Sequence, residues 1–250
     1  MTTDPAEDDR EIGHRLPALR ERIASACARS GRSPEEVTLV GVSKRQTASR
    51  VAAAIRAGVT HVGENYVAEL RDKRAEVERL LAADPAHGRL AAGVVWRMIG
   101  SLQRNKVKTI VPLVAAVDTV DRESLAVALD RRAGAAGTVL SICLQVDLDA
   151  EPQKGGVAPE SLPALLATCQ ALENLRVTGL MAVPARVDRP EESRPAFARL
   201  RALRDTLRSE SGCATLRELS MGMSADFEIA IEEGATLVRV GTALFGPRID

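Results

Sequence analysis

Aromatic residues are scarce in this sequence, at 2% of its 250 residues, so its core must be built from Ala, Val, Leu and Ile. Net charge is absent as well, because 34 basic residues balance 34 acidic ones. A neutral chain argues against a general role at nucleic acid or at membrane surfaces, since both normally require a strong positive patch. The one basic run, at residues 104–108, is typical of a solvated helix start.

Paired cysteines are missing too. The four cysteines lie far apart and form no Cys-x-x-Cys pair, which favours reduced thiols over a disulfide or zinc framework. The three histidines have no metal-ligand spacing. No apolar run reaches the length of a membrane span, and the acidic start of the chain does not resemble a signal peptide. We therefore expect a cytoplasmic protein that holds no metal ion.

Strands and helices alternate along the chain. Short runs rich in Val, Ile and Leu predict strands, and apolar residues at helical spacing predict the helices between them. The predicted strands cover residues 37–43, 61–63, 94–99, 115–118, 139–147, 177–182, 218–221 and 237–240. The predicted helices cover residues 10–30, 49–57, 66–81, 105–111, 122–132, 160–172, 191–209 and 225–232.

This alternation predicts an α/β fold with a parallel sheet and right-handed crossovers. Eight strand–helix units in one chain favour a single (β/α)8 barrel of the TIM type, with an extra N-terminal helix and branched aliphatic residues in its interior. An open, doubly wound sheet is the alternative. We expect residues 1–9 to be a disordered tail and residues 10–250 to form the barrel. The long connections at 147–159 and 184–195 follow strands, so they would lie at the rim where barrels build their active sites.

Lys44 ends the first predicted strand, after the apolar run at residues 39–42. At the rim of a barrel such a lysine would be partly desolvated, which favours its neutral, nucleophilic form. An amine in that form can condense with an aldehyde to give an imine. On position alone, an ordinary surface lysine is an equally good interpretation.

The loops after the last two predicted strands could hold a phosphate, as such loops do in many barrels. Gly241 and Thr242 follow the eighth strand and offer backbone N–H groups and a hydroxyl. Ser220 is the better candidate for a second hydroxyl, because Ser224 stands at the position of a helix N-cap. Arg239 lies within an apolar strand, where an unpaired charge is costly, so it either pairs with a buried acid or faces a ligand.

Seven motifs in a fixed order carry a resemblance to a known family. They are Leu-Val-Gly-Val-Ser-Lys at 39–44, His-Val-Gly-Glu-Asn-Tyr at 61–66, Trp-Arg-Met-Ile-Gly-Ser-Leu-Gln-Arg-Asn-Lys at 96–106, Glu-Pro-Gln-Lys-Gly-Gly at 151–156, Gly-Leu-Met at 179–181, Leu-Ser-Met-Gly-Met-Ser-Ala-Asp at 219–226 and Arg-Val-Gly-Thr-Ala-Leu-Phe-Gly at 239–246. On these motifs the chain resembles the pyridoxal 5′-phosphate (PLP) homeostasis proteins of the YggS/PROSC type, whose fold is that of the alanine racemase N-terminal barrel.

The resemblance implies a PLP site and the role of each residue in it. Lys44 would carry PLP as a Schiff base, Asn65 would lie beside the ring, and Arg239 would face the pyridine nitrogen. Lys154 would be a second lysine near the cofactor that receives PLP during transfer. The phosphate would be held by Ser220, Gly241 and Thr242.

Two positions depart from the family pattern. The family often has Trp-His where this chain has Trp96 and Arg97, and it has a proline soon after the lysine where this chain has Arg45, Gln46 and Thr47. Both positions lie beside the motifs that define the resemblance. We therefore expect them to change neighbouring contacts rather than the cofactor itself.

Three functions remain to be weighed. The chain could be a carrier that buffers PLP and passes it to apo PLP-dependent enzymes, an amino-acid racemase that uses Lys44 as a base, or a Schiff-base aldolase without PLP. Racemisation requires a second base, usually a tyrosine, and the one tyrosine here is Tyr66, at a strand end. We expect no appended β-domain that could supply another. A phosphate cradle and Arg239 suit a ring-bearing ligand, so a monomeric, non-catalytic carrier is favoured, with weak or narrow racemase activity as the alternative.

Overall fold

A closed barrel of eight parallel strands forms the centre of the molecule, and the strands follow one another around it in chain order. The structure is a computed structural model and describes residues 4–83, 87–149 and 155–247. The strands are β1 Thr38–Val42, β2 His61–Glu64, β3 Val95–Met98, β4 Ala116–Val120, β5 Leu140–Gln145, β6 Leu175–Met181, β7 Glu218–Ser220 and β8 Leu237–Val240. The predicted (β/α)8 barrel is confirmed, and closure between β1 and β8 excludes the open sheet.

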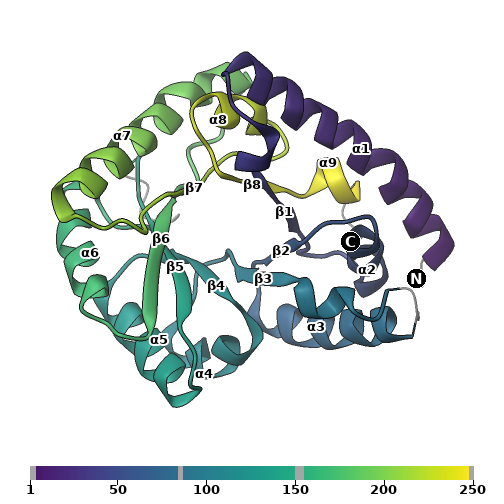
Figure 1. The fold of residues 1–250 in the computed structure, drawn as a ribbon, viewed down its shortest axis with the longest axis horizontal. Coiled ribbons are helices and arrows are strands. Elements are labelled where there is room, and N and C mark those ends of the chain that lie inside the picture. The colour runs from purple at the N-terminus through teal and green to yellow at the C-terminus, as the bar shows by residue number, and fades with distance from the viewer. Residues whose placement is uncertain (1–3, 84–86, 150–154, 248–250) are drawn as a thin grey trace.

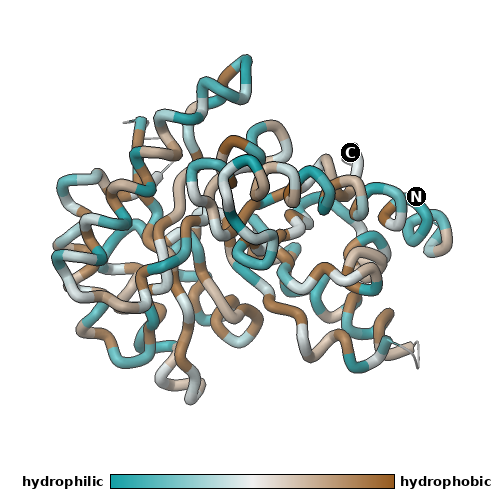
Figure 2. Tube along the Cα trace, turned by 45° about the horizontal axis from the view of Figure 1, so that its top comes forward, coloured by the Kyte–Doolittle hydropathy of each residue, from teal (hydrophilic) through white to brown (hydrophobic). Residues whose placement is uncertain are grey.

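The helices form a ring around these strands (Figure 1). Those that follow the strands are α2 Ala48–Arg56, α3 Val67–Ala82, α4 Val107–Ile110, α5 Glu123–Ala135, α6 Leu162–Gln170, α7 Arg194–Ser211, α8 Phe227–Glu232 and α9 Thr242–Phe245. Along the tube in Figure 2, hydrophilic and hydrophobic residues alternate on the helical coils, as expected for helices with one buried face. Within the described residues, every helix is too short or too polar to cross a membrane.

The N-terminal helix α1, Pro5–Arg29, lies outside the barrel and packs on α2, α8 and α9. It begins earlier than predicted, so residues 5–9 are helical rather than a disordered tail. Asp4 caps the helix by accepting a hydrogen bond from the backbone N–H of Ala6, and Pro5 stands at the first helical position. Asp8 is buried and forms an ion pair of 3.1 Å with Arg50 on α2. This contact with a residue far along the chain overrides the polar composition of the segment.

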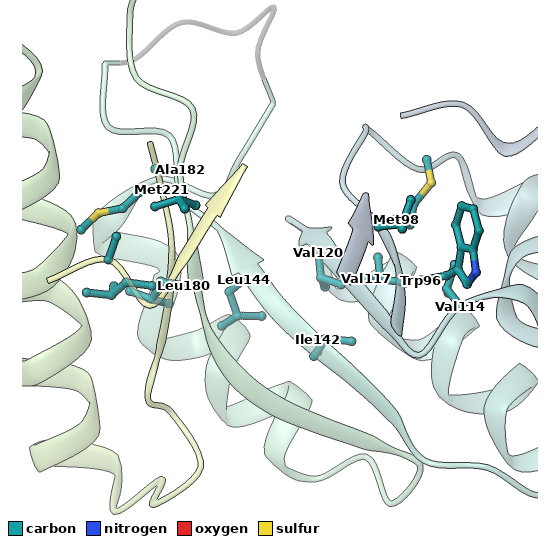
Figure 3. Packing of buried hydrophobic residues seen from close by; sticks show 14 of the residues in the cluster. Trp96, Met98, Val114, Val117, Val120, Ile142, Leu144, Leu180, Ala182 and Met221 are labelled. Carbon is teal, nitrogen blue, oxygen red and sulfur yellow. The ribbon is translucent and has the colours of Figure 1, made fainter. Parts of the chain in front are cut away.

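Most of the hydrophobic core lies between the strands and the helices. Side chains on a strand alternate between its two faces. Trp96 and Met98 on β3 are buried together with Val117 on β4 and Ile142 on β5, in one cluster that also includes helical residues (Figure 3). The side chains of these four residues point outward, toward the helices. The residues between them on the same strands therefore point into the barrel.

The barrel interior contains charged residues besides Arg239, and these were not predicted. Arg97 of β3 forms an ion pair with Asp118 of β4 and reaches Glu218 of β7 at 3.3 Å. Since β3 and β7 are not neighbours, this contact crosses the barrel. Val40 is a branched aliphatic residue that lies in this interior as predicted, against the backbone of Gly63. The prediction of a branched aliphatic interior is therefore wrong for these central positions, because the apolar residues of β3, β4 and β5 face the helices instead.

Candidate functional site

Lys44 lies in a tight turn at the end of β1. The backbone N–H of Gln46 donates to the carbonyl of Ser43 at 2.9 Å, so Lys44 and Arg45 occupy the two central positions of the turn. Arg45 has a φ of 57°, a left-handed conformation that glycine adopts readily and larger residues adopt at a cost. The Lys44 residue is half-buried. The turn thus presents the lysine at the rim of the barrel, as the sequence predicted.

Asn65 lies at the same rim, directly after β2. A Cβ atom on Gly100 would come within 2.2 Å of the Asn65 carbonyl oxygen, so only glycine allows the segment after β3 to pack this closely. The backbone N–H of Asn65 donates to the Glu64 carboxylate at 2.7 Å. These two contacts fix the backbone of Asn65 next to the turn that carries Lys44.

Buried polar atoms without a hydrogen-bond partner gather in this sector of the rim. Among the described residues, Asn65 Oδ1, Gln46 Oε1 and Ser49 Oγ are buried and have no partner, and the fourth such atom, Arg132 Nε, is on α5. Buried polar atoms are normally hydrogen-bonded, and an exception points to a missing water or ligand. The first three lie within a few residues of Lys44 or of the end of β2. This arrangement fits a polar ligand at the rim.

The loops after β7 and β8 are joined through Ser224. Its hydroxyl oxygen accepts hydrogen bonds from the backbone N–H groups of Gly241 at 3.2 Å and Ala243 at 3.3 Å. The prediction that Ser224 caps the following helix is wrong, because α8 begins only at Phe227 and its N-cap is Asp226. Ser224 therefore belongs to the cradle that was predicted from Gly241 and Thr242.

Gly241 brings this cradle next to the end of β1. A Cβ atom on Gly241 would lie 3.7 Å from the Cβ atom of Val42, two residues before Lys44. Thr242 is exposed, so its hydroxyl can reach a ligand. The hydroxyl of Thr242 and the O–H of Ser224, whose oxygen accepts from Gly241 and Ala243, give an anion two neutral donors close to the lysine.

Arg239 and Ser220 lie deeper in the barrel than the rest of the site. The guanidinium of Arg239 donates to the hydroxyl of Ser220 and to the carbonyl of Ala182, both at 2.8 Å. Burial lowers the pKa of Arg239, while the nearby carboxylates of Asp118 and Asp226 oppose that shift. In the described part of the chain its direct partners are thus a hydroxyl and a carbonyl, not the paired acid that was the alternative prediction.

A chain of charged and polar groups connects Arg239 on β8 to Arg97 on β3. Ser220 donates to Asp118 at 3.4 Å, and Asp118 accepts from Arg97 at 2.8 Å. Burial opposes the charge on Arg97, but Asp118 and Glu218 outweigh it and raise the pKa of Arg97. Burial and the Arg97 charge lower the pKa of His61. Arg97, where this chain departs from the family pattern, is therefore linked to Arg239 through the side chains of Asp118 and Ser220.

Six of the seven predicted site residues lie at or below one end of the barrel, on β1, β2, β7 and β8 or directly after these strands: Lys44, Asn65, Ser220, Arg239, Gly241 and Thr242. Lys154 lies outside the described residues. Sequence reasoning missed Ser224 and the partners of Arg97. An isolated charge within an otherwise apolar strand was the signal that could have identified Asp118.

Comparison with known proteins gives consistent matches over the whole barrel. The family model for the alanine racemase N-terminal domain matches residues 15–248. A protein of Aquifex aeolicus named pyridoxal phosphate homeostasis protein is 40% identical over 234 residues, which are 94% of this chain and 97% of that protein. A protein of Pseudomonas aeruginosa with the same name is 41% identical over 237 residues, which are 95% of this chain and 96% of that protein.

Solved structures with the same fold fall into two groups. PipY of Synechococcus elongatus PCC7942, solved with PLP bound, is 35% identical and superimposes with a TM-score of 0.80, covering 94% of this chain and 100% of that one. The D-threonine aldolase of Filomicrobium marinum is 15% identical, with a TM-score of 0.67, and this chain covers 60% of its length. The second likeness shows the shared barrel and carries no information on activity.

Proposed function

Since this chain belongs to the alanine racemase N-terminal domain family, we propose that it binds PLP and takes part in PLP homeostasis in the cytoplasm. The proteins named pyridoxal phosphate homeostasis protein are its relatives in sequence. The observation that carries the proposal is that Lys44 and the Ser224–Gly241 cradle lie at the same rim. Lys44 follows β1, and Gly241 follows the neighbouring strand β8. Three unpartnered buried acceptors in the same sector support it. PLP would supply an aldehyde that condenses reversibly with an amine, and a ring that can stabilise carbanions.

Each residue of the site has a separate task in this proposal. Lys44 holds the aldehyde covalently, and Asn65 offers its free side-chain oxygen beside the ring. Thr242, Gly241 and Ser224 hold the phosphate. Ser220 remains a predicted phosphate contact, although its hydroxyl already joins Arg239 to Asp118. Lys154 is proposed as the second lysine that receives PLP during transfer.

Arg239 favours a carrier over an enzyme. Ser220 and Ala182 hold its guanidinium in place, and a fixed cation disfavours a second positive charge on a nearby nitrogen. If Arg239 faces the ring, the ring nitrogen stays unprotonated and withdraws electrons weakly. Tyr66, the one tyrosine of the chain, is 52% exposed at the start of α3, a poor place for a second base. We therefore propose a non-catalytic monomer whose partners are PLP and apo PLP-dependent enzymes.

The carrier and racemase proposals differ in the rate at which the α-proton of an amino acid exchanges. We expect the PLP-loaded protein to exchange α-protons slowly with each proteinogenic amino acid in deuterated water, as followed by NMR. We also expect it to reactivate an apo PLP enzyme. Exchange at about 1 s⁻¹ or faster, the low end of typical enzyme turnover, that disappears in Lys44→Ala would contradict the carrier proposal and support the racemase.

Replacing the two cradle hydroxyls tests the phosphate contacts. The double variant Ser224→Ala/Thr242→Ala is expected to weaken PLP binding in an equilibrium titration, because each hydrogen bond to a charged group contributes about 1.5–3 kcal/mol, or roughly tenfold or more in affinity. Pyridoxal, which lacks the phosphate, is the control ligand and should bind both proteins equally. Equal losses for PLP and pyridoxal would show that the cradle does not hold the phosphate. The single variant Ser220→Ala, titrated in parallel, shows whether that hydroxyl contributes.

A further inference from the structure

The turn that carries Lys44 is held from below by an ion cluster. The ammonium of Lys73, on α3, donates to the Glu64 carboxylate at 2.8 Å and to the Glu69 carboxylate at 2.7 Å. The same ammonium donates to the backbone carbonyl of Ser43 at 2.5 Å. Glu64 is fully buried and the Lys73 side chain is 5% exposed, so these contacts are protected from solvent.

Two further hydrogen bonds run from the turn to the same carboxylates. The hydroxyl of Ser43 donates to Glu64 at 2.8 Å, and the backbone N–H of Arg45 donates to Glu69 at 2.5 Å. These contacts hold the residues on either side of Lys44, Ser43 and Arg45. The cluster fixes the backbone on both sides of Lys44.

The conformation of Arg45 requires such support. A residue with a side chain at a φ of 57° persists only where its surroundings hold it there. The hydrogen bond that the backbone N–H of Arg45 donates to the Glu69 carboxylate supplies that constraint. Without it, the turn can relax toward conformations that point Lys44 elsewhere.

We propose that Glu64, Lys73 and Glu69 form a positioning unit that holds the amine of Lys44 in place for covalent capture of an aldehyde ligand. The inference rests on the proposed function, and it assigns the unit to one step, the approach of the amine to the carbonyl carbon. A misplacement of about 1 Å can slow a reaction between oriented groups by up to about a hundredfold. Binding of a ligand that makes no bond to Lys44 depends on the cradle and not on the unit.

Glu69→Ala tests the unit with little risk to the fold, because the Glu69 side chain is 26% exposed and the Glu64–Lys73 pair remains. We expect the rate at which PLP becomes fixable by borohydride to fall about tenfold or more. In the apo protein, the rate at which an amine-reactive reagent acetylates Lys44 should also differ from the native rate. Peptide mass mapping measures this rate. The affinity for pyridoxine 5′-phosphate, which has no aldehyde, should stay at the native value.

Three variants separate positioning from a general structural role. Glu69→Gln keeps an oxygen that accepts the Arg45 N–H and should retain a rate close to the native one. Adding Arg45→Gly to Glu69→Ala should raise the rate again, since glycine adopts positive φ without support. Glu76→Ala, which breaks an exposed pair with Arg79 on the same helix, is the matched control and should have no effect.

The outcomes are distinct. A native rate of PLP fixation and of Lys44 acetylation in Glu69→Ala would overturn the positioning unit. So would a matching loss of pyridoxine 5′-phosphate affinity, because the whole site would then have collapsed. If the native chain fixes no PLP at all, the proposed function fails, while the acetylation of Lys44 in the apo protein still decides on the unit.

Discussion

Lys44→Ala is expected to remove the principal covalent attachment of PLP, to less than one fixed PLP per chain, while leaving the barrel folded. The amine is the group that condenses with the aldehyde, and alanine has no replacement for it. PLP should then bind mainly through the cradle and the ring contacts, and most of it should be removed by gel filtration after borohydride treatment. The measurement is the mass of the intact protein after that treatment, compared with the native chain.

Lys106→Ala is the matched control, because Lys106 is exposed in the basic run and its loss should leave the borohydride-fixed mass unchanged. A Lys44→Ala protein that still carries one fixed PLP per chain would contradict the assignment. In that case another lysine, with Lys154 the first candidate, would be the principal attachment site.

Asp118→Asn is expected to cause the largest loss of stability. The substitution preserves the shape of the side chain but removes the negative charge beside Arg97, and both side chains are almost completely buried. Breaking a buried ion pair by removing one partner costs about 3–5 kcal/mol. Glu218, which is 3.3 Å from Arg97 and 32% exposed, compensates the remaining charge only in part. For a chain of this size, about 2–4 °C of melting temperature are lost per kcal/mol. The expected decrease is therefore roughly 6–20 °C by circular dichroism.

Asp72→Asn provides the control for this prediction. Asp72 pairs with Arg71 on the surface of α3, where both side chains are more than half exposed. Surface pairs of this kind contribute about 0–1 kcal/mol, so the melting temperature should change little. Similar melting temperatures for the two variants would mean that the charges inside the barrel do not depend on one another.

The arrangement of the strands could be predicted from the sequence because each strand is a short apolar run between polar helices. All eight predicted strands are present, including β8 with the predicted bounds. It was harder to predict which strand residues point into the barrel and which point toward the helices. Trp96, Arg97 and Met98 alternate between apolar and charged, and this pattern does indicate an Arg97 that points away from the apolar face. Reading the strands as uniformly apolar concealed the polar interior.

The contacts that shape the site depend on residues far apart in the sequence. Arg45 lies in a conformation typical of glycine, and the carboxylate that holds it is 24 residues away. No local pattern predicts such a turn, because turn preferences favour Gly or Asn at that position. Ser224 directly precedes the helix predicted at 225–232, the position of an N-cap, yet α8 begins at Phe227 and the Ser224 hydroxyl contacts the loop after β8. The sequence therefore predicts the members of the site better than their partners.

The most direct test of the central claim is to reduce the PLP-loaded native protein with borohydride and to map the modified peptide by mass spectrometry. We predict that the pyridoxyl group is found on Lys44, in the peptide that joins β1 to α2. A pyridoxyl group found only on another lysine, or on none, would contradict the claim that this chain carries PLP on Lys44.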